Sequence, residues 1–69
     1  MKYLVMAYRL GDIHSYHFPV GIFDSKEKAV SEAKIHYNYR GAKYDHMVFS
    51  LEENESYDGE ESKREWVTG

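Results

Sequence analysis

One stretch, PVGIFDSKEKA at residues 19–29, constrains the fold of this 69-residue chain more than any other. Its apolar half ends at Phe23, and Asp24 and Ser25 follow directly. Both residue types are favoured at helix N-caps, and Glu27, three residues after Asp24, approximates a capping box. The stretch therefore predicts a strand that passes into a helix with almost no loop.

We expect this helix to run from Lys26 to Asn38 or Tyr39. Gly41 stands just past that end, where glycine commonly stops a helix. The apolar stripe of the helix consists of Ala29, Ala33 and Tyr37, flanked by Val30 and His36. The small alanines predict a helix that lies close against a sheet.

Three segments are rich in strand-forming residues: residues 2–9, 16–23 and 43–52. The first is apolar on both of its alternating sets, which is typical of a central strand. The second contains Pro19, which cannot donate to a strand ladder and so favours an edge position. Gly21 in the same segment indicates a bulge or a close backbone approach.

The order of elements is β-β-α-β, and residues 63–69, KREWVTG, form either a short last strand near 64–68 or a loose end. We therefore predict an α+β fold: a small antiparallel sheet of three or four strands with one helix packed on one face. Residues 1–52 make the ββαβ domain, and residues 53–69 make an acidic tail.

One helix can cover only one face of such a sheet. We expect the covered face to take Leu4, Met6, Tyr8, Phe18, Val20, Ile22, Met47, Phe49 and Leu51. The other face then carries Tyr3, Val5, Ala7, His17, Tyr44, His46 and Val48. That face is too apolar to be left in water, so it is either an interface or covered by the tail through Trp66.

Charge and composition indicate the cellular compartment in which we expect the protein. Residues 52–69 carry a net charge of −5, whereas residues 1–51 carry +2. The chain has no cysteine, which fits a reducing cytoplasm and excludes disulfides and thiolate metal sites. Its start, MKYLVMAYRLGD, is interrupted by charge too early for a signal peptide or a membrane span. We expect a cytoplasmic protein.

Catalytic and cofactor motifs are missing from the sequence. No G-x-S-x-G, P-loop or G-x-G-x-x-G motif is present. His14 and His17 lie in a turn and a strand, and His46 could neighbour His17, but a metal site needs at least three converging ligands. We expect no enzyme activity, no cofactor and no metal.

The joint GIFDSKEKA at residues 21–29, followed by RGAKYDHMVF, resembles small uncharacterised proteins of bacteriophages and bacteria. Those proteins open with a tyrosine-rich strand and carry a G-[IV]-F-x-S-x-E-x-A-like junction. The resemblance covers residues 3–51 and implies a small accessory or host-interaction protein.

These observations predict a small non-enzymatic binding protein that docks on a partner protein and modulates or inhibits it. The expected contact residues are Tyr3, Val5, His17, Tyr44, His46 and Val48. The acidic tail either steers the encounter or serves as a solubilising end. A small core and seven tyrosines also favour a homodimer.

The alternative function is single-stranded RNA or DNA binding. In this hypothesis tyrosines of the open sheet face stack on bases. The cations available for phosphate are Lys2, Arg9, Arg40 and Lys43. The net negative charge of the chain weighs against it.

Overall fold

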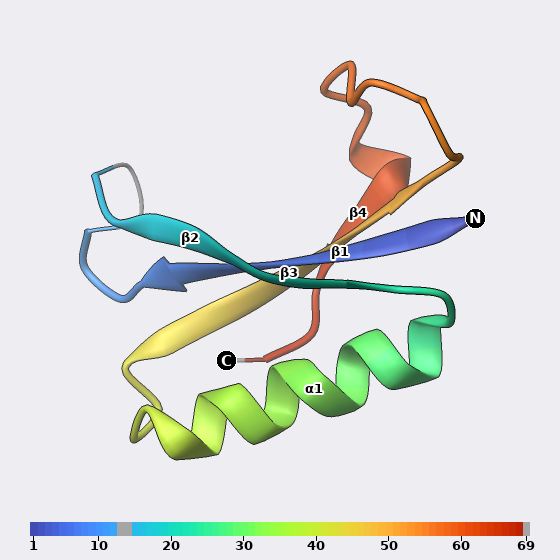
Figure 1. The fold of residues 1–69 in the computed structure, drawn as a ribbon. Coiled ribbons are helices and arrows are strands. Elements are labelled where there is room, and N and C mark those ends of the chain that lie inside the picture. The colour runs from blue at the N-terminus through green and yellow to red at the C-terminus, as the bar shows by residue number, and fades with distance from the viewer. Residues whose placement is uncertain (13–14, 69) are drawn as a thin grey trace.

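The computed structural model describes residues 1–12 and 15–68, which form a four-stranded sheet and one α-helix (Figure 1). The elements are β1 (Lys2–Arg9), β2 (His17–Phe23), α1 (Lys26–Tyr39), β3 (Tyr44–Leu51), the 3₁₀-helix η1 (Glu61–Lys63) and β4 (Arg64–Trp66). The predicted α+β class is confirmed, and the chain forms the last strand that the sequence left open.

The sheet has the order β2-β1-β3-β4, and every neighbouring pair is antiparallel. β1 is central, as its two apolar sets predicted, and β2, which contains Pro19, is an edge strand. The register between β1 and β2 shifts after Val5, where Val5 pairs with Gly21 but Met6 pairs with Pro19. Val20 is therefore the extra residue of a bulge.

The joint between β2 and α1 forms as predicted, with Ser25 as the N-cap. The Ser25 hydroxyl accepts a hydrogen bond from the backbone N–H of Lys28 at 3.1 Å, which satisfies one donor of the first helical turn. Asp24 instead forms an ion pair with Lys2 of β1. Past the helix, Gly41 adopts a positive φ of 65°, a conformation that glycine enters without steric cost.

The structure shows that the prediction of the covered face was wrong for β1 and β3 and for Ile22, whereas Phe18 and Val20 do lie on the helix side as predicted. The buried core joins Val5 and Val48 of the sheet to Ala29 and Ala33 of α1, and all four side chains are fully or almost fully buried. Leu4, Met6 and the residues paired with them lie on the opposite side. The small side chains of Ala29 and Ala33 let α1 lie close against Val5 and Val48 at the centre of this face.

The C-terminal segment contributes to both faces of the sheet. Tyr57 packs edge-on against Phe49, with ring centroids 4.9 Å apart. Beyond β4 the chain passes to the helix side of the sheet, where Val67 packs against the core and its N–H donates to the carbonyl of His46 (Figure 1). Within residues 1–12 and 15–68, no helix is long and apolar enough to cross a membrane.

Candidate functional site

The structure does not bring the six predicted contact residues together on an accessible surface. Val5, His46 and Val48 are fully or almost fully buried beneath α1, and Tyr44 is also buried. Tyr3 packs against the edge of the same core. Four of these residues are covered within the monomer, and Tyr3 is partly buried.

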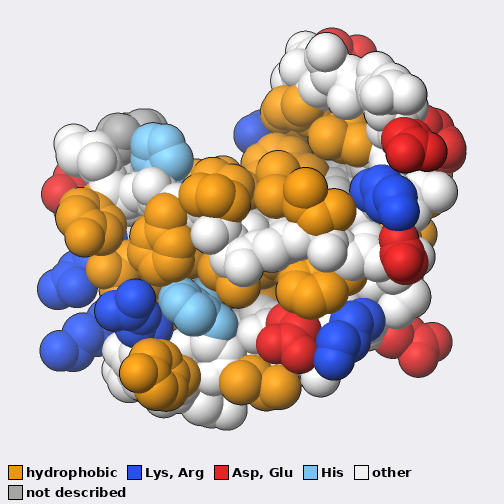
Figure 2. Space-filling view, viewed as in Figure 1, with side chains coloured by type: hydrophobic (Ala, Val, Ile, Leu, Met, Phe, Trp, Pro, Cys, Tyr) orange, Lys and Arg blue, Asp and Glu red, His pale blue; other side chains and the backbone are white. Residues whose placement is uncertain are grey.

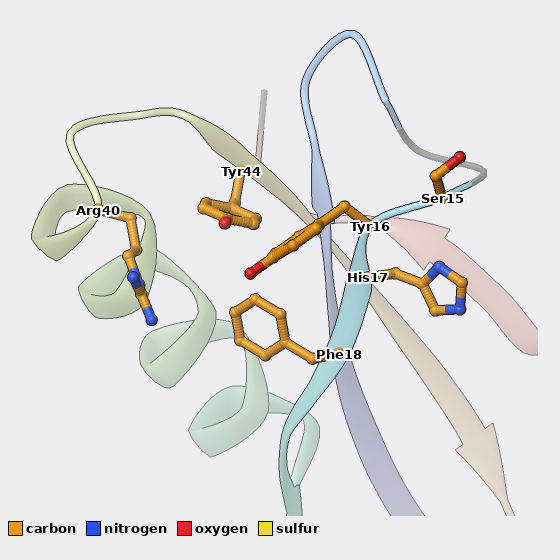
Figure 3. A pocket seen from close by; sticks show the side chains of 6 residues that line it. All are labelled: Ser15, Tyr16, His17, Phe18, Arg40 and Tyr44. Carbon is orange, nitrogen blue, oxygen red and sulfur yellow. The ribbon is translucent and has the colours of Figure 1, made fainter.

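The sixth residue, His17, is exposed and points to the opposite side of the sheet (Figure 3). It pairs in register with Tyr8, and the two rings stack at 5.8 Å. His17 and His46, which the sequence allowed to be neighbours, therefore lie on opposite faces of the sheet. His14 lies outside the described residues.

His46 instead forms a buried polar chain with His36 of α1 and with Thr68. The Thr68 hydroxyl accepts from the His46 backbone N–H at 2.6 Å and lies 3.0 Å from His46 Nδ1. We assign the Thr68 hydroxyl as the donor to His46 Nδ1, because no other acceptor for this hydroxyl is found among the described residues. The other nitrogen of His46, Nε2, then carries the proton and donates to His36 Nδ1 at 2.6 Å.

Both imidazoles are held neutral. Burial, with a smaller contribution from His36, lowers the pKa of His46 to about 4. Burial and the charge of Arg40 also lower the pKa of His36. The pair is therefore a structural contact in its uncharged form at neutral pH. No third His, Asp or Glu joins it or any other pair to form a metal-binding group within residues 1–12 and 15–68.

The sheet face away from α1 is a second, largely apolar surface, which we call the open face. It consists of Leu4, Met6, Tyr8, Pro19, Ile22, Met47, Phe49 and Trp66. The register places these residues in rows, with Met6 between Pro19 and Met47, and with Trp66 beside Met47. In the described part of the chain, no helix covers this face (Figure 1).

Parts of the open face remain accessible. The side chain of Ile22 is 67% exposed and that of Trp66 is 50% exposed, although Trp66 packs edge-on against Tyr8 with ring centroids 5.3 Å apart. Figure 2 shows a hollow between the β1–β2 end of the molecule and the segment of residues 52–63, with hydrophobic side chains along its floor. Beside Trp66, a pocket of about 430 Å³ is lined by Met47, Glu61, Arg64 and Glu65.

An orphan acceptor lies beside the open face. Asp45 pairs in register with Tyr8, so its side chain leaves β3 on the same side as the open face. One of its carboxylate oxygens, Oδ1, is buried and has no hydrogen-bond partner among the described residues. Buried polar atoms are normally satisfied, and this oxygen is an exception within the described part of the chain.

A separate cluster of aromatic and basic side chains lies where α1 ends and β3 begins. We call it the aromatic corner, and it consists of Arg9, Tyr16, Phe18, Arg40 and Tyr44. Figure 3 shows Tyr16, Phe18 and Tyr44 converging from β2 and β3, with Arg40 beside them. Two open pockets meet here, of about 420 and 360 Å³, and Tyr16 and Tyr44 line both.

Charge is divided between the two ends of the molecule. In the view of Figure 2, Lys and Arg gather at the end of α1, and Asp and Glu gather mostly at the other side. The ion pairs among the described residues involve Lys2, Lys26, Lys28, Lys63, Arg64 and the N-terminus. Arg9, Arg40 and Lys43 form none of them, so the aromatic corner has uncompensated positive charge.

The sequence contained a signal that could have placed the open face correctly. Phe23 precedes the helix cap, which is the position of a hydrophobic staple, and a staple residue faces the helix it packs on. Because Phe23 and Gly21 belong to one alternating set, and Phe23 pairs with Tyr3 in the sheet, that set lies under α1. The bulge at Val20 then transfers Pro19 to the open face.

Comparison of the chain with protein-family models, with curated proteins and with solved structures found no match in any of the three.

Proposed function

We propose that the protein is a small non-enzymatic binding protein that docks by its open face on a partner protein and modulates or inhibits that partner. The observation that carries the proposal is the exposure of large apolar side chains, above all Ile22 and Trp66, on a sheet face without a helix. Exposed large apolar side chains on one face of a small protein are typical of interaction sites.

Energetics favour a partner on this face. Burial of one large aliphatic side chain contributes about 1.5–3 kcal/mol, and tryptophan is enriched among the residues that dominate binding energy. Ile22 and Trp66 stand on the two outer strands, β2 and β4, so an occupant that covers both spans the whole width of the sheet.

Shape and charge indicate the chemistry of the partner. The hollow in Figure 2 fits a convex apolar element, such as one face of an amphipathic helix. Its wall at one side is the acidic segment 52–61, in which Glu52, Glu53, Glu60 and Glu61 are exposed. We therefore commit to a partner whose apolar face is flanked by basic residues, which the acidic segment steers into place.

The cytoplasm is the proposed location, because the chain has no cysteine. A phage or bacterial regulator of a host protein is the setting that the resemblance of residues 21–29 implies. The binding test depends on neither the cellular location nor the biological source of the protein.

The test uses Trp66, the single tryptophan of the chain, as a reporter on the open face. Amphipathic helical peptides with a leucine face are titrated into the protein, one series flanked by lysines and a matched series flanked by glutamates. Binding of the lysine series should shift Trp66 emission to shorter wavelength, because the indole leaves water. The glutamate series should bind more weakly, and added salt should reduce the difference between the two series.

Two variants locate the contact. Ile22→Asp should weaken peptide binding at least tenfold, whereas Ile35→Asp, which charges an equally exposed position on α1, should not. Circular dichroism confirms that both variants are folded. Equal effects of the two variants, or no emission shift with any peptide, would contradict the proposal.

Sedimentation equilibrium of the chain alone tests whether it forms a homodimer. A dimer that Ile22→Asp dissociates would assign the open face to a second copy and would overturn the proposal of a different partner. A monomer at all concentrations leaves the face free for the peptide.

A further inference from the structure

We propose that the aromatic corner binds a nucleotide unit of single-stranded nucleic acid, with the base on Tyr16 and the phosphate on Arg9 and Arg40. The site is distinct from the open face. It lies on the helix side of the sheet, at the end where α1 stops, and shares no residue with the proposed protein-docking surface.

The rings of the corner are fixed by their own packing. Phe18 and Tyr44 meet edge-on with centroids 5.4 Å apart, and His36 packs edge-on against Phe18 at 5.6 Å. Tyr16 leans on Tyr44 at 6.2 Å but remains 55% exposed. The cluster therefore presents one accessible ring on a rigid base, which is the arrangement that stacking on an unpaired base requires.

Tyr16 is also held through its backbone. Its N–H donates to the carbonyl of Asp12, and its carbonyl accepts from the N–H of Arg9 at 3.0 Å. These bonds fix the position of the residue just before β2 begins. The exposed ring is thus carried by an ordered backbone, and stacking on it would cost little conformational entropy.

Two guanidinium groups flank the rings. Arg9 lies 5.5 Å from the centroid of Tyr44, and Arg40 lies 5.6 Å from the same centroid on a different element. Each is oriented by a cation–π contact, and neither has a carboxylate partner within the ion-pair distance among the described residues. Guanidinium is the group that best matches phosphate geometry.

Charges around the corner favour an anion. Lys43, next to Tyr44, is exposed, and Asp12 lines the pocket on the Arg9 side. The neighbouring imidazole of His36 has a lowered pKa and adds no charge at neutral pH. Two guanidinium groups, Arg9 and Arg40, against the carboxylate of Asp12 leave the corner positive in a chain of net charge −3.

The combination of rings and cations selects a nucleotide over a simple anion. Inorganic phosphate would use the arginines and leave Tyr16 without a role. The two adjoining pockets, about 420 and 360 Å³, fall within the size range of small-molecule sites. A base pair in a duplex has no free face for Tyr16, so the ligand is single-stranded.

This site differs from the tyrosine platform expected from the sequence. Of the four cations proposed there, Arg9 and Arg40 lie at the corner, whereas Lys2 is paired with Asp24. Tyr44 belongs to the site, but Tyr3 packs against the core. The ligand is single-stranded nucleic acid in both hypotheses, but the aromatic corner is a different surface from the tyrosine platform.

The test measures fluorescence anisotropy of short labelled oligothymidylate and oligouridylate with the full chain. Two to three phosphate contacts predict an affinity that falls roughly 7- to 18-fold between about 50 and 200 mM salt. Tyr16→Ala should weaken binding at least fivefold, because the stacking surface is lost. Its matched control, Tyr39→Ala, removes a tyrosine that is 83% exposed near the end of α1 and should have no effect.

A second pair of variants tests the cations. Arg40→Gln should weaken binding and flatten the salt dependence, whereas Lys28→Gln, which removes a charge from the first turns of α1, should leave both nearly unchanged. Ile22→Asp should leave oligonucleotide binding intact, so this result is independent of the protein-docking test.

Four outcomes would overturn the proposal. The corner would be a simple anion site if inorganic phosphate displaced the oligonucleotide as well as a mononucleotide does and if Tyr16→Ala bound the oligonucleotide with full affinity. Duplex bound as tightly as single strand would exclude stacking. A polyglutamate peptide that binds in place of the oligonucleotide would assign the corner to acidic protein. No binding at low salt would remove the site.

Discussion

Nδ1 of His36 on α1 lies 2.6 Å from Nε2 of His46 on β3, so two imidazoles share one proton position at the buried contact between helix and sheet. His46 is fully buried and also bonds to Thr68. The contact ties α1, β3 and the C-terminal segment together. Protonation of His46 would add a hydrogen at Nδ1, where the ring now accepts from Thr68, and would place a charge on a fully buried ring, so this contact makes the fold sensitive to acid.

Mild acid should therefore destabilise the protein. The pKa of His46 is about 4 in the folded state against 6.5 in the unfolded chain, so the unfolded state binds the proton first as the pH falls. The free energy of unfolding should be highest above the unfolded pKa and should decrease by about 3 kcal/mol as the pH approaches 4. Urea denaturation between about pH 7.5 and 5 measures the loss above the range in which carboxylates titrate.

Two variants test the source of this acid sensitivity. His46→Leu should flatten the pH dependence, and His17→Gln, which removes an exposed imidazole, should retain it. A wild-type free energy of unfolding that is constant over this range would exclude the buried histidine as the cause.

The close approach of α1 to the sheet predicts that Ala33 cannot be enlarged. Ala33 is fully buried against Val5 and Val48, so Ala33→Leu should destabilise the fold by about 1–3 kcal/mol through overpacking. Ser31→Leu places the same side chain on the exposed side of the helix and should change stability little. Chemical denaturation compares the two. An equal loss in both variants would contradict close packing at Ala33 as the source of the cost, because leucine has a higher helix propensity than serine.

The N-cap at Ser25 predicts a loss of about 1 kcal/mol for Ser25→Ala, because the Lys28 N–H loses its acceptor at the start of α1. The matched control is Ser31→Ala, in the exposed middle of the same helix, which should be neutral or slightly stabilising. Thermal unfolding followed at a helix-sensitive wavelength measures both. If the two variants melt together, Asp24 rather than Ser25 serves as the cap.

Gly21 lies directly under the ring of Phe23. A Cβ at residue 21 would come within 3.0 Å of the ring atom Cζ, so Gly21→Ala should force the ring away from the core and cost about 1 kcal/mol or more. In a Phe23→Leu background the same substitution should cost less, because the ring is gone. A double-mutant cycle by urea denaturation gives the coupling energy, and a value of zero would contradict the contact.

Local chemistry was sufficient to predict the elements of this fold. The two apolar sets of β1 indicated a central strand, Pro19 indicated an edge, and Asp24-Ser25 with Gly41 bracketed the helix closely. These features depend on backbone conformation and hydrogen bonding over a few residues. A short-range pattern in the sequence reports them directly.

Apart from the position of Phe23 before the helix cap, the sequence did not indicate which face of the sheet is covered, and the tertiary structure decided it together with which side chains are accessible. Period-2 alternation divides β1 and β3 into two sets, and both sets are apolar, so the pattern carries no sign that tells inside from outside. Three tertiary features determine the buried face. They are the packing of Val5 and Val48 against Ala29 and Ala33, the bulge at Val20, and the hydrogen bond between His36 and His46. Close packing depends on the volumes of side chains that lie far apart in the sequence, and for this reason the open face and the aromatic corner became visible only in the folded chain.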